Sequence, residues 1–103
     1  MNPRVEKQRC AAAVREVIAL SEDLFRIVCR HDPDAPDHGD PIGPVFDDAM
    51  RAAADAEYRA EIAGYGGVAS HMREVMARLA VADVDAARAA AERALRNLDV
   101  GDR

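Results

Sequence analysis

A long stripe of apolar residues at helical spacing dominates the first thirty residues of the chain. Its members follow one another at alternating intervals of four and three: Cys10, Val14, Val17, Ser21, Leu24 and Val28. A period of 3.5 residues places all of them on one side of an α-helix. Asn2 can cap this helix, Pro3 suits its first position, and Pro33 prevents its continuation. The pattern therefore predicts a helix over residues 3–31, whose apolar side is interrupted by one polar residue, Ser21.

Three further periodic segments predict three shorter helices, over residues 44–63, 68–82 and 84–99. Gly43 and Pro44 fit the start of the first of these, and the glycines after residue 63 fit its end. Asp83 fits the N-cap of the last. No segment alternates between apolar and polar residues with period two, so we expect no strands. The sequence thus predicts an all-α fold: one domain over residues 1–103, a bundle of four helices with a Pro/Asp-rich connector at 32–43.

The apolar content is rich in alanine, which limits the core that one copy of the chain can build. Of the 103 residues, 22 are alanine, and at about 25 cal/mol per Å² a methyl group contributes far less on burial than a leucine side chain. The first helix is also longer than its neighbours, so we expect part of its apolar side to be uncovered in a monomer. Self-association is a common remedy for a thin core. We therefore expect a homo-oligomer, preferably a dimer, with its interface at Val14, Val17, Ile18, Leu24, Phe25 and Val28.

The charge of the chain is acidic, with a formal net charge of −5 at pH 7. Residues 32–61 carry two basic and nine acidic side chains, whereas nucleic acids and anionic membranes require a basic surface. We therefore expect neither as a partner. The sequence has no run of about 18 apolar residues and no N-terminal segment of the signal-peptide kind, so we expect a cytoplasmic protein. Cys10 and Cys29 share one predicted helix, too far apart for a disulfide, and reduced thiols are expected.

Four ionisable side chains on the second and third predicted helices form a candidate metal site. Glu57 and Glu61 lie four residues apart, and His71 and Glu74 lie three apart. Carboxylates and histidines that project from facing helices are the ligands of metal sites in helical bundles. In the alternative reading, Glu57 pairs with an arginine, the other two glutamates are solvated, and His71 lies at the edge of the core. A bundle that binds a divalent metal or small ligand is the second hypothesis for the function.

The connector, HDPDAPDHGDPIGP over residues 31–44, offers a further set of candidate metal ligands. These are His31, Asp34, Asp37, His38 and Asp40, which are residue types found in zinc, manganese and calcium sites. Neither obvious frame of the segment matches a calcium-binding EF-hand loop. Its two ends also have structural explanations, because they stop one helix and start the next. We therefore expect mainly a solvated connector, in which His38 is the first residue to mutate.

No arrangement typical of an active site stands out in the sequence. Cys10 is central on an apolar helix side, an environment that leaves a thiol unreactive. Ser21, Ser70 and His71 form no recognisable catalytic triad, and the segment GYGG follows a helix rather than a strand, unlike a phosphate-binding loop. We therefore expect no catalytic residues and no cofactor. The first hypothesis is a small helical protein that self-associates and acts as a protein-interaction or regulatory module, or as an accessory subunit of a larger complex.

Overall fold

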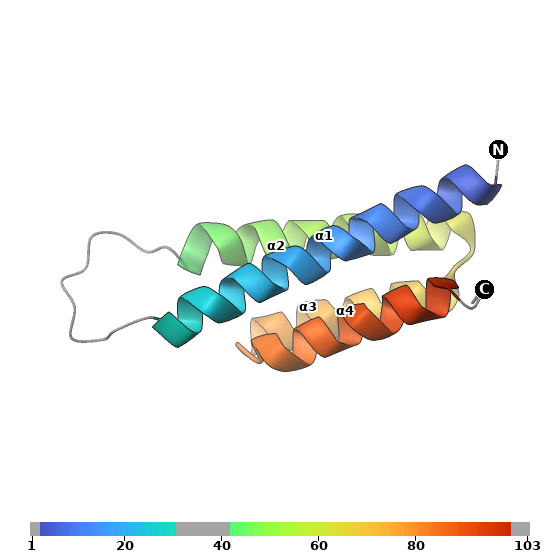
Figure 1. Cartoon of the computed structure of the whole chain (residues 1–103). Helices are drawn as coiled ribbons and strands as arrows, with labels where there is room; N and C mark the ends of the chain where they lie inside the picture. The colour runs from blue at the N-terminus through green and yellow to red at the C-terminus, as the bar shows by residue number, and fades with distance from the viewer. Residues whose placement is uncertain (1–2, 31–41, 100–103) are drawn as a thin grey trace.

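The computed structural model describes the backbone of residues 3–30 and 42–99 and the side chains of residues 4–27 and 43–99. Within these ranges it has no strand and four α-helices: α1 (Pro3–Arg30), α2 (Ile42–Ala63), α3 (Gly66–Ala80) and α4 (Val84–Asp99). Each helix packs antiparallel against the next, and α4 returns to pack against α1 (Figure 1). Among the described residues, no Cα atoms of the diagonal pairs α1/α3 and α2/α4 lie within 8 Å of each other. The predicted all-α four-helix bundle is confirmed.

The turn between α2 and α3 needs one left-handed residue, Gly64, whose φ is +85°. The N–H groups of Gly64 and Tyr65 donate to the carbonyl oxygens of Glu61 and Ala60, at 3.2 and 2.8 Å. This pair of bonds is the Schellman arrangement that commonly ends a helix at a glycine. Because Gly64 alone makes the turn, Gly66 is already helical, and α3 begins two residues before its predicted start. α2 also begins two residues before its predicted start, at Ile42. Pro44 then lies within the first turn, where the missing N–H of a proline breaks no helical hydrogen bond.

The turn between α3 and α4 has the same geometry but places an alanine, Ala82, at the left-handed position, with φ of +62°. The N–H groups of Ala82 and Asp83 donate to the carbonyl oxygens of Leu79 and Arg78, at 2.9 and 2.8 Å. α3 therefore ends two residues earlier than predicted. The Oδ1 atom of Asp83 accepts a hydrogen bond from the N–H of Ala86 at 3.2 Å, which confirms the predicted cap of α4.

The core of the bundle is built largely from alanine. Ten of the 21 buried apolar side chains are alanines. Among the described side chains of α2, those that are buried are all alanines: Ala49, Ala53, Ala56 and Ala60. The larger buried side chains come mainly from α1 and α3, and small side chains on the facing helices let the axes approach closely. Ser21 is the one buried polar residue in the described part of the chain, and its Oγ has no hydrogen-bond partner.

The four helices differ in length, as the sequence predicts. α1 has 28 residues and α2 has 22, whereas α3 and α4 have 15 and 16. Figure 1 shows that α1 and α2 both extend past the α3–α4 turn, at the end of the bundle nearest the connector. The extra length of α1 is therefore accompanied by α2, which packs along it.

Candidate functional site

Three of the six residues predicted to form an interface lie in the core of the monomer. Val14, Val17 and Leu24 are 0 to 1% exposed, so on the folded monomer they are not available to a partner. The sequence prediction misplaces them because alanine-lined helices approach closely enough to cover the centre of the stripe. Ile18 is partly buried, whereas Phe25 is 37% exposed. The side chain of Val28 lies outside the described residues.

The candidate metal ligands Glu57 and Glu61 surround an arginine. Arg73 Nε lies 3.3 Å from Glu57 Oε2, and Arg73 NH2 donates a hydrogen bond to Glu61 Oε1 at 2.8 Å. The hydrogen bond that Arg73 donates to Glu61 is the main reason that the pKa of Arg73 is raised. The guanidinium group thus already provides the positive charge between the two carboxylates. The arginine pairing considered for Glu57 from the sequence is confirmed, and Glu61 shares the same arginine.

The other two candidate ligands, His71 and Glu74, lie one turn apart on α3, and Glu74 also contacts α4. Glu74 Oε1 accepts a hydrogen bond from Arg93 NH2 at 3.3 Å, and Glu74 Oε2 lies 3.8 Å from His71 Nδ1. Across residues 3–30 and 42–99, no three His, Cys, Asp or Glu side chains are grouped so that they could hold a metal ion. The structure therefore does not bring the four candidates together as one ligand set. The connector candidates His31, Asp34, Asp37, His38 and Asp40 lie outside the described residues.

An open groove of about 420 Å³ runs between α1 and α2. It is lined by Glu16, Leu20, Asp48, Arg51, Ala52 and Asp55. Ligand pockets are usually enclosed and mostly apolar, with a few converging polar groups. This groove is shallow and has charges of both signs on its walls, so its geometry resembles a surface furrow between two helices more than a small-molecule site.

The thiol of Cys10 is buried in the core and unbonded. Burial raises its pKa, and the nearby positive charge of Arg59 opposes this more weakly. A thiol of raised pKa inside an apolar core is a poor nucleophile. The structure thus agrees with the structural role assigned to Cys10 from the sequence.

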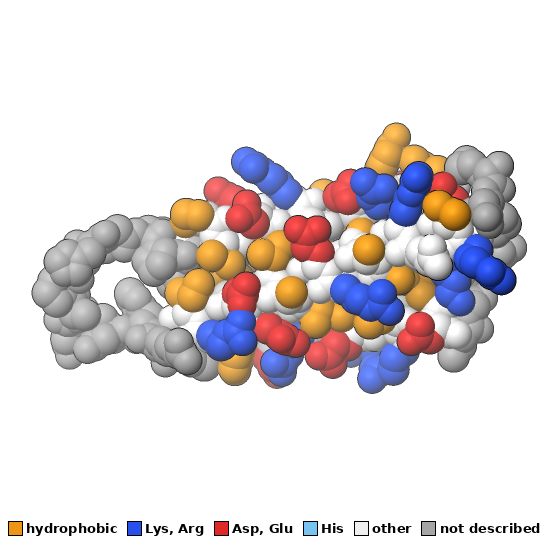
Figure 2. Space-filling view, turned by 45° about the horizontal axis from the view of Figure 1, so that its top comes forward, with side chains coloured by type: hydrophobic (Ala, Val, Ile, Leu, Met, Phe, Trp, Pro, Cys, Tyr) orange, Lys and Arg blue, Asp and Glu red, His pale blue; other side chains and the backbone are white. Residues whose placement is uncertain are grey.

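The most exposed large apolar side chains of the helices lie on the outer side of α2. Tyr58 and Ile62 are 64% and 52% exposed, one helical turn apart. The fully buried positions of α2 thus hold only alanine, and Val45, Phe46 and Met50 pack partly buried against the core, whereas Tyr58 and Ile62 stand in solvent. Sequence reasoning missed these two residues, although their spacing from Ala53, Ala56 and Ala60 already places them on the opposite side. Elsewhere the surface is mixed, and on the face shown in Figure 2 hydrophobic side chains alternate with charged ones.

No helix among the described residues combines the length and the apolar character needed to cross a membrane. Comparisons of the chain with protein-family models, with curated proteins and with solved structures find no significant match. The assignment of a function therefore depends on the geometry of the surface.

Proposed function

We propose that this chain is a protein-interaction module that docks onto another protein through the outer side of α2, around Tyr58 and Ile62. The observation that carries the proposal is the exposure of these two large side chains on a helix whose fully buried positions hold only alanine. A chain with a thin alanine core gains stability from every large apolar side chain that it buries. Two such side chains held in solvent on one helix side contribute little to the fold, and large aromatic and aliphatic groups are typical anchors of protein interfaces.

The charge of α2 indicates the chemistry of the partner. Its sequence contains five acidic and two basic residues, a net charge of −3. Asp55 pairs with Arg59 at 2.9 Å on the same helix, and Glu57 and Glu61 share Arg73 of α3, so the acidic side chains nearest Tyr58 and Ile62 already have basic partners. The expected partner therefore recognises this surface mainly through an apolar pocket for Tyr58 and Ile62.

Self-association and a cytoplasmic location complete the proposal. Two residues of the expected interface, Ile18 and Phe25, stay partly exposed, which supports contact with a further copy. The buried free thiol of Cys10 is consistent with a reducing compartment.

Site-specific photo-crosslinking tests the docking surface. A photo-reactive amino acid at position 62 should form a discrete adduct with one partner in cells that express the protein naturally. Val81, which is 69% exposed in the α3–α4 turn, is the matched control position and should give no such adduct. The double variant Tyr58→Ser/Ile62→Ser should abolish binding of the identified partner and change the free energy of unfolding by no more than about 0.5 kcal/mol, as usual for exposed positions. Equal adducts at positions 62 and 81, or a partner retained by the double variant, would refute the proposal.

A further inference from the structure

The side of the bundle formed by α1 and α4 carries a second apolar stripe, distinct from the outer side of α2. Ala11, Ile18 and Phe25 follow one another at intervals of seven residues on α1, and Leu95 lies on α4, which packs against α1. The first two and Leu95 are partly buried, and Phe25 is 37% exposed. Residues seven apart share one helix side, so the stripe continues along the length over which the two helices pack.

The register of the two helices follows from one contact. The guanidinium carbon of Arg88 lies 5.5 Å from the centre of the Phe25 ring. Because α1 and α4 are antiparallel, moving seven residues toward the start of α1 corresponds to moving seven toward the end of α4, which sets Ile18 level with Leu95. By the same count, Arg15 is level with the last turn of α4, which contains Asp99.

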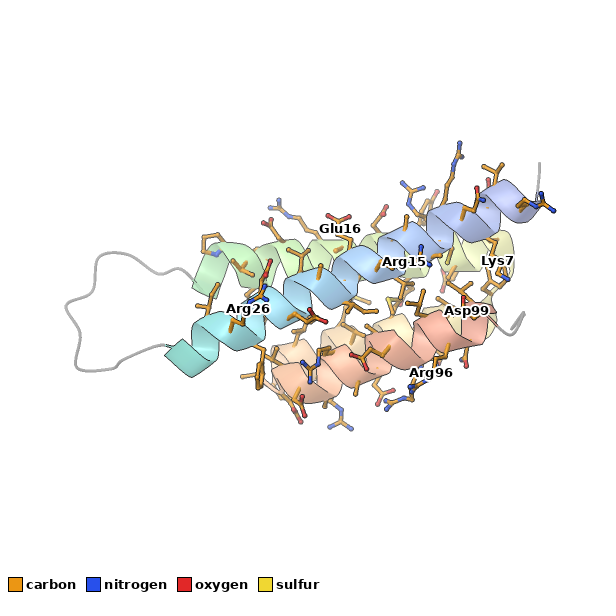
Figure 3. All side chains as sticks on the ribbon, viewed as in Figure 1. Lys7, Arg15, Glu16, Arg26, Arg96 and Asp99 are labelled. Atoms are coloured by element: carbon orange, nitrogen blue, oxygen red, sulfur yellow. The ribbon has the colours of Figure 1, made fainter. Side chains whose placement is uncertain are left out.

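Charges of opposite sign border this stripe. Figure 3 shows Lys7, Arg15 and Arg26 along α1, and Arg96 and Asp99 toward the end of α4. Arg26 is paired with Asp23 on its own helix. Arg15 and Asp99, in contrast, make no ion pair with any described residue, and both are exposed. An apolar centre with a charged rim is the usual anatomy of a protein interface.

We infer that the α1/α4 face is the surface through which two copies of this chain pair about a two-fold axis parallel to the helices. Such an axis places α1 of one copy on α4 of the other without changing height along the helices. Arg15 of one copy then meets Asp99 of the second copy, twice by symmetry, and the Ile18, Phe25 and Leu95 side chains meet around the axis. The inference extends the proposed function, since it supplies the self-association that the function includes.

The distribution of charge favours this axis over the alternative. A two-fold axis perpendicular to the helices places α1 on α1 of the second copy, and the sequence of α1 contains six basic and four acidic residues, a net charge of +2. That arrangement sets two helices of the same net charge against each other, which disfavours association. The parallel axis instead sets α1 against α4, whose three basic and three acidic residues balance. Glu22 then falls level with Arg88 and Glu92, which lie 3.8 Å apart on α4.

Charge reversal tests this interface, with association measured by sedimentation equilibrium of the untagged chain. We expect the wild-type chain to dimerise. Arg15→Glu and Asp99→Arg should each weaken their own homodimer about tenfold, because two attractive contacts become repulsive. A mixture of the two variants should form heterodimer at close to the wild-type affinity, since each copy then supplies the charge that the other lacks. Arg51→Glu, an exposed reversal on α2, is the matched control and should leave association unchanged.

The mixture separates contacts between copies from contacts within one chain, because an Arg15–Asp99 pair inside a monomer cannot be restored by mixing. A wild-type dimer unaffected by Arg15→Glu, or a mixture with no excess of heterodimer, overturns the assigned face. Tighter association of Arg15→Glu alone points to the α1-on-α1 arrangement and also overturns it. A strictly monomeric wild-type chain at several hundred micromolar overturns self-association, while docking through α2 is judged separately by the adduct at position 62.

Discussion

Ser21 is the residue whose substitution is expected to change the stability of the chain most clearly. Its side chain is 0% exposed on the core side of α1, and its Oγ has no hydrogen-bond partner. A buried hydroxyl without a partner costs about 1–3 kcal/mol relative to an apolar group of similar shape. Replacement by alanine removes this cost and adds about 0.5 kcal/mol of helix propensity. We therefore expect Ser21→Ala to raise the free energy of unfolding by about 1.5 kcal/mol or more.

Ser70 provides a matched control for this substitution, since it is an exposed serine within α3. Ser70→Ala changes the same atoms on a helix but removes no buried group, so it should add only the propensity term of about 0.5 kcal/mol. The difference between the two variants isolates the burial term. Urea denaturation followed by circular dichroism measures both, at one fixed protein concentration because dimerisation also affects apparent stability.

A loss of stability in Ser21→Ala, or a gain no larger than that of Ser70→Ala, would contradict the argument. Either result would mean that the hydroxyl is hydrogen-bonded in solution. The backbone carbonyl four residues earlier, at Val17, is the partner that a helical serine most often reaches. Infrared or proton-exchange measurements on the serine hydroxyl would then show its protection.

Three further outcomes follow from individual residues. Ala82→Gly should stabilise the chain by about 1 kcal/mol, because glycine adopts a positive φ without steric strain; an unchanged urea midpoint would contradict this. Arg73→Met should lower the melting temperature, because it leaves the half-buried charge of Glu57 without its partner. Adding Glu57→Gln should recover most of this loss, and a double variant no more stable than Arg73→Met alone would count against the pairing. Cys10 should resist thiol reagents in the folded chain, tested with Cys29→Ser. Because burial raises its pKa in the folded state, the thiol should contribute stability that is intact at neutral pH and is lost as the pH rises above about 8.5, the pKa of an unfolded thiol. A Cys10→Ala variant with an identical alkaline profile would exclude this.

The helices could be predicted from the sequence because periodicity, proline and capping residues act locally. Asp83 is an example, since its cap depends on a hydrogen bond only three residues long. The errors lie at helix ends, where several residue types satisfy the same turn. Of the glycines at 64, 66 and 67, the structure uses only Gly64 for the left-handed position at the α2–α3 turn. At the next turn an alanine takes this position, an outcome that residue preference alone would not indicate.

The candidate site was less predictable, because the same apolar pattern is produced by a core and by an interface. The stripe through Val14, Val17 and Leu24 has the spacing of either one, and its burial depends on how closely the other helices approach. The distance between the helix axes is a property of the assembled bundle. It is set by alanines such as Ala53 on α2 and Ala91 on α4, the two helices that pack against α1. For the carboxylates, sequence spacing placed Glu57 and Glu61 correctly on one helix side but could not show that Arg73 reaches between them.

The position of each α1 residue around the helix separates what the fold uses from what remains for a partner. The centre of the stripe, with Val14 and Val17, is buried in the core of the monomer. Substitutions there therefore cannot distinguish a monomer from a dimer. The flank, with Ile18 and Phe25, meets α4 only partly and remains accessible beside Arg15. A polar substitution of Val17 would therefore be expected to unfold the chain, whereas charge reversal at Arg15 would be expected to leave the fold intact and alter association alone. Only the flank can be tested for an interface without confounding by loss of the fold, because its exposed charges contribute little to the bundle.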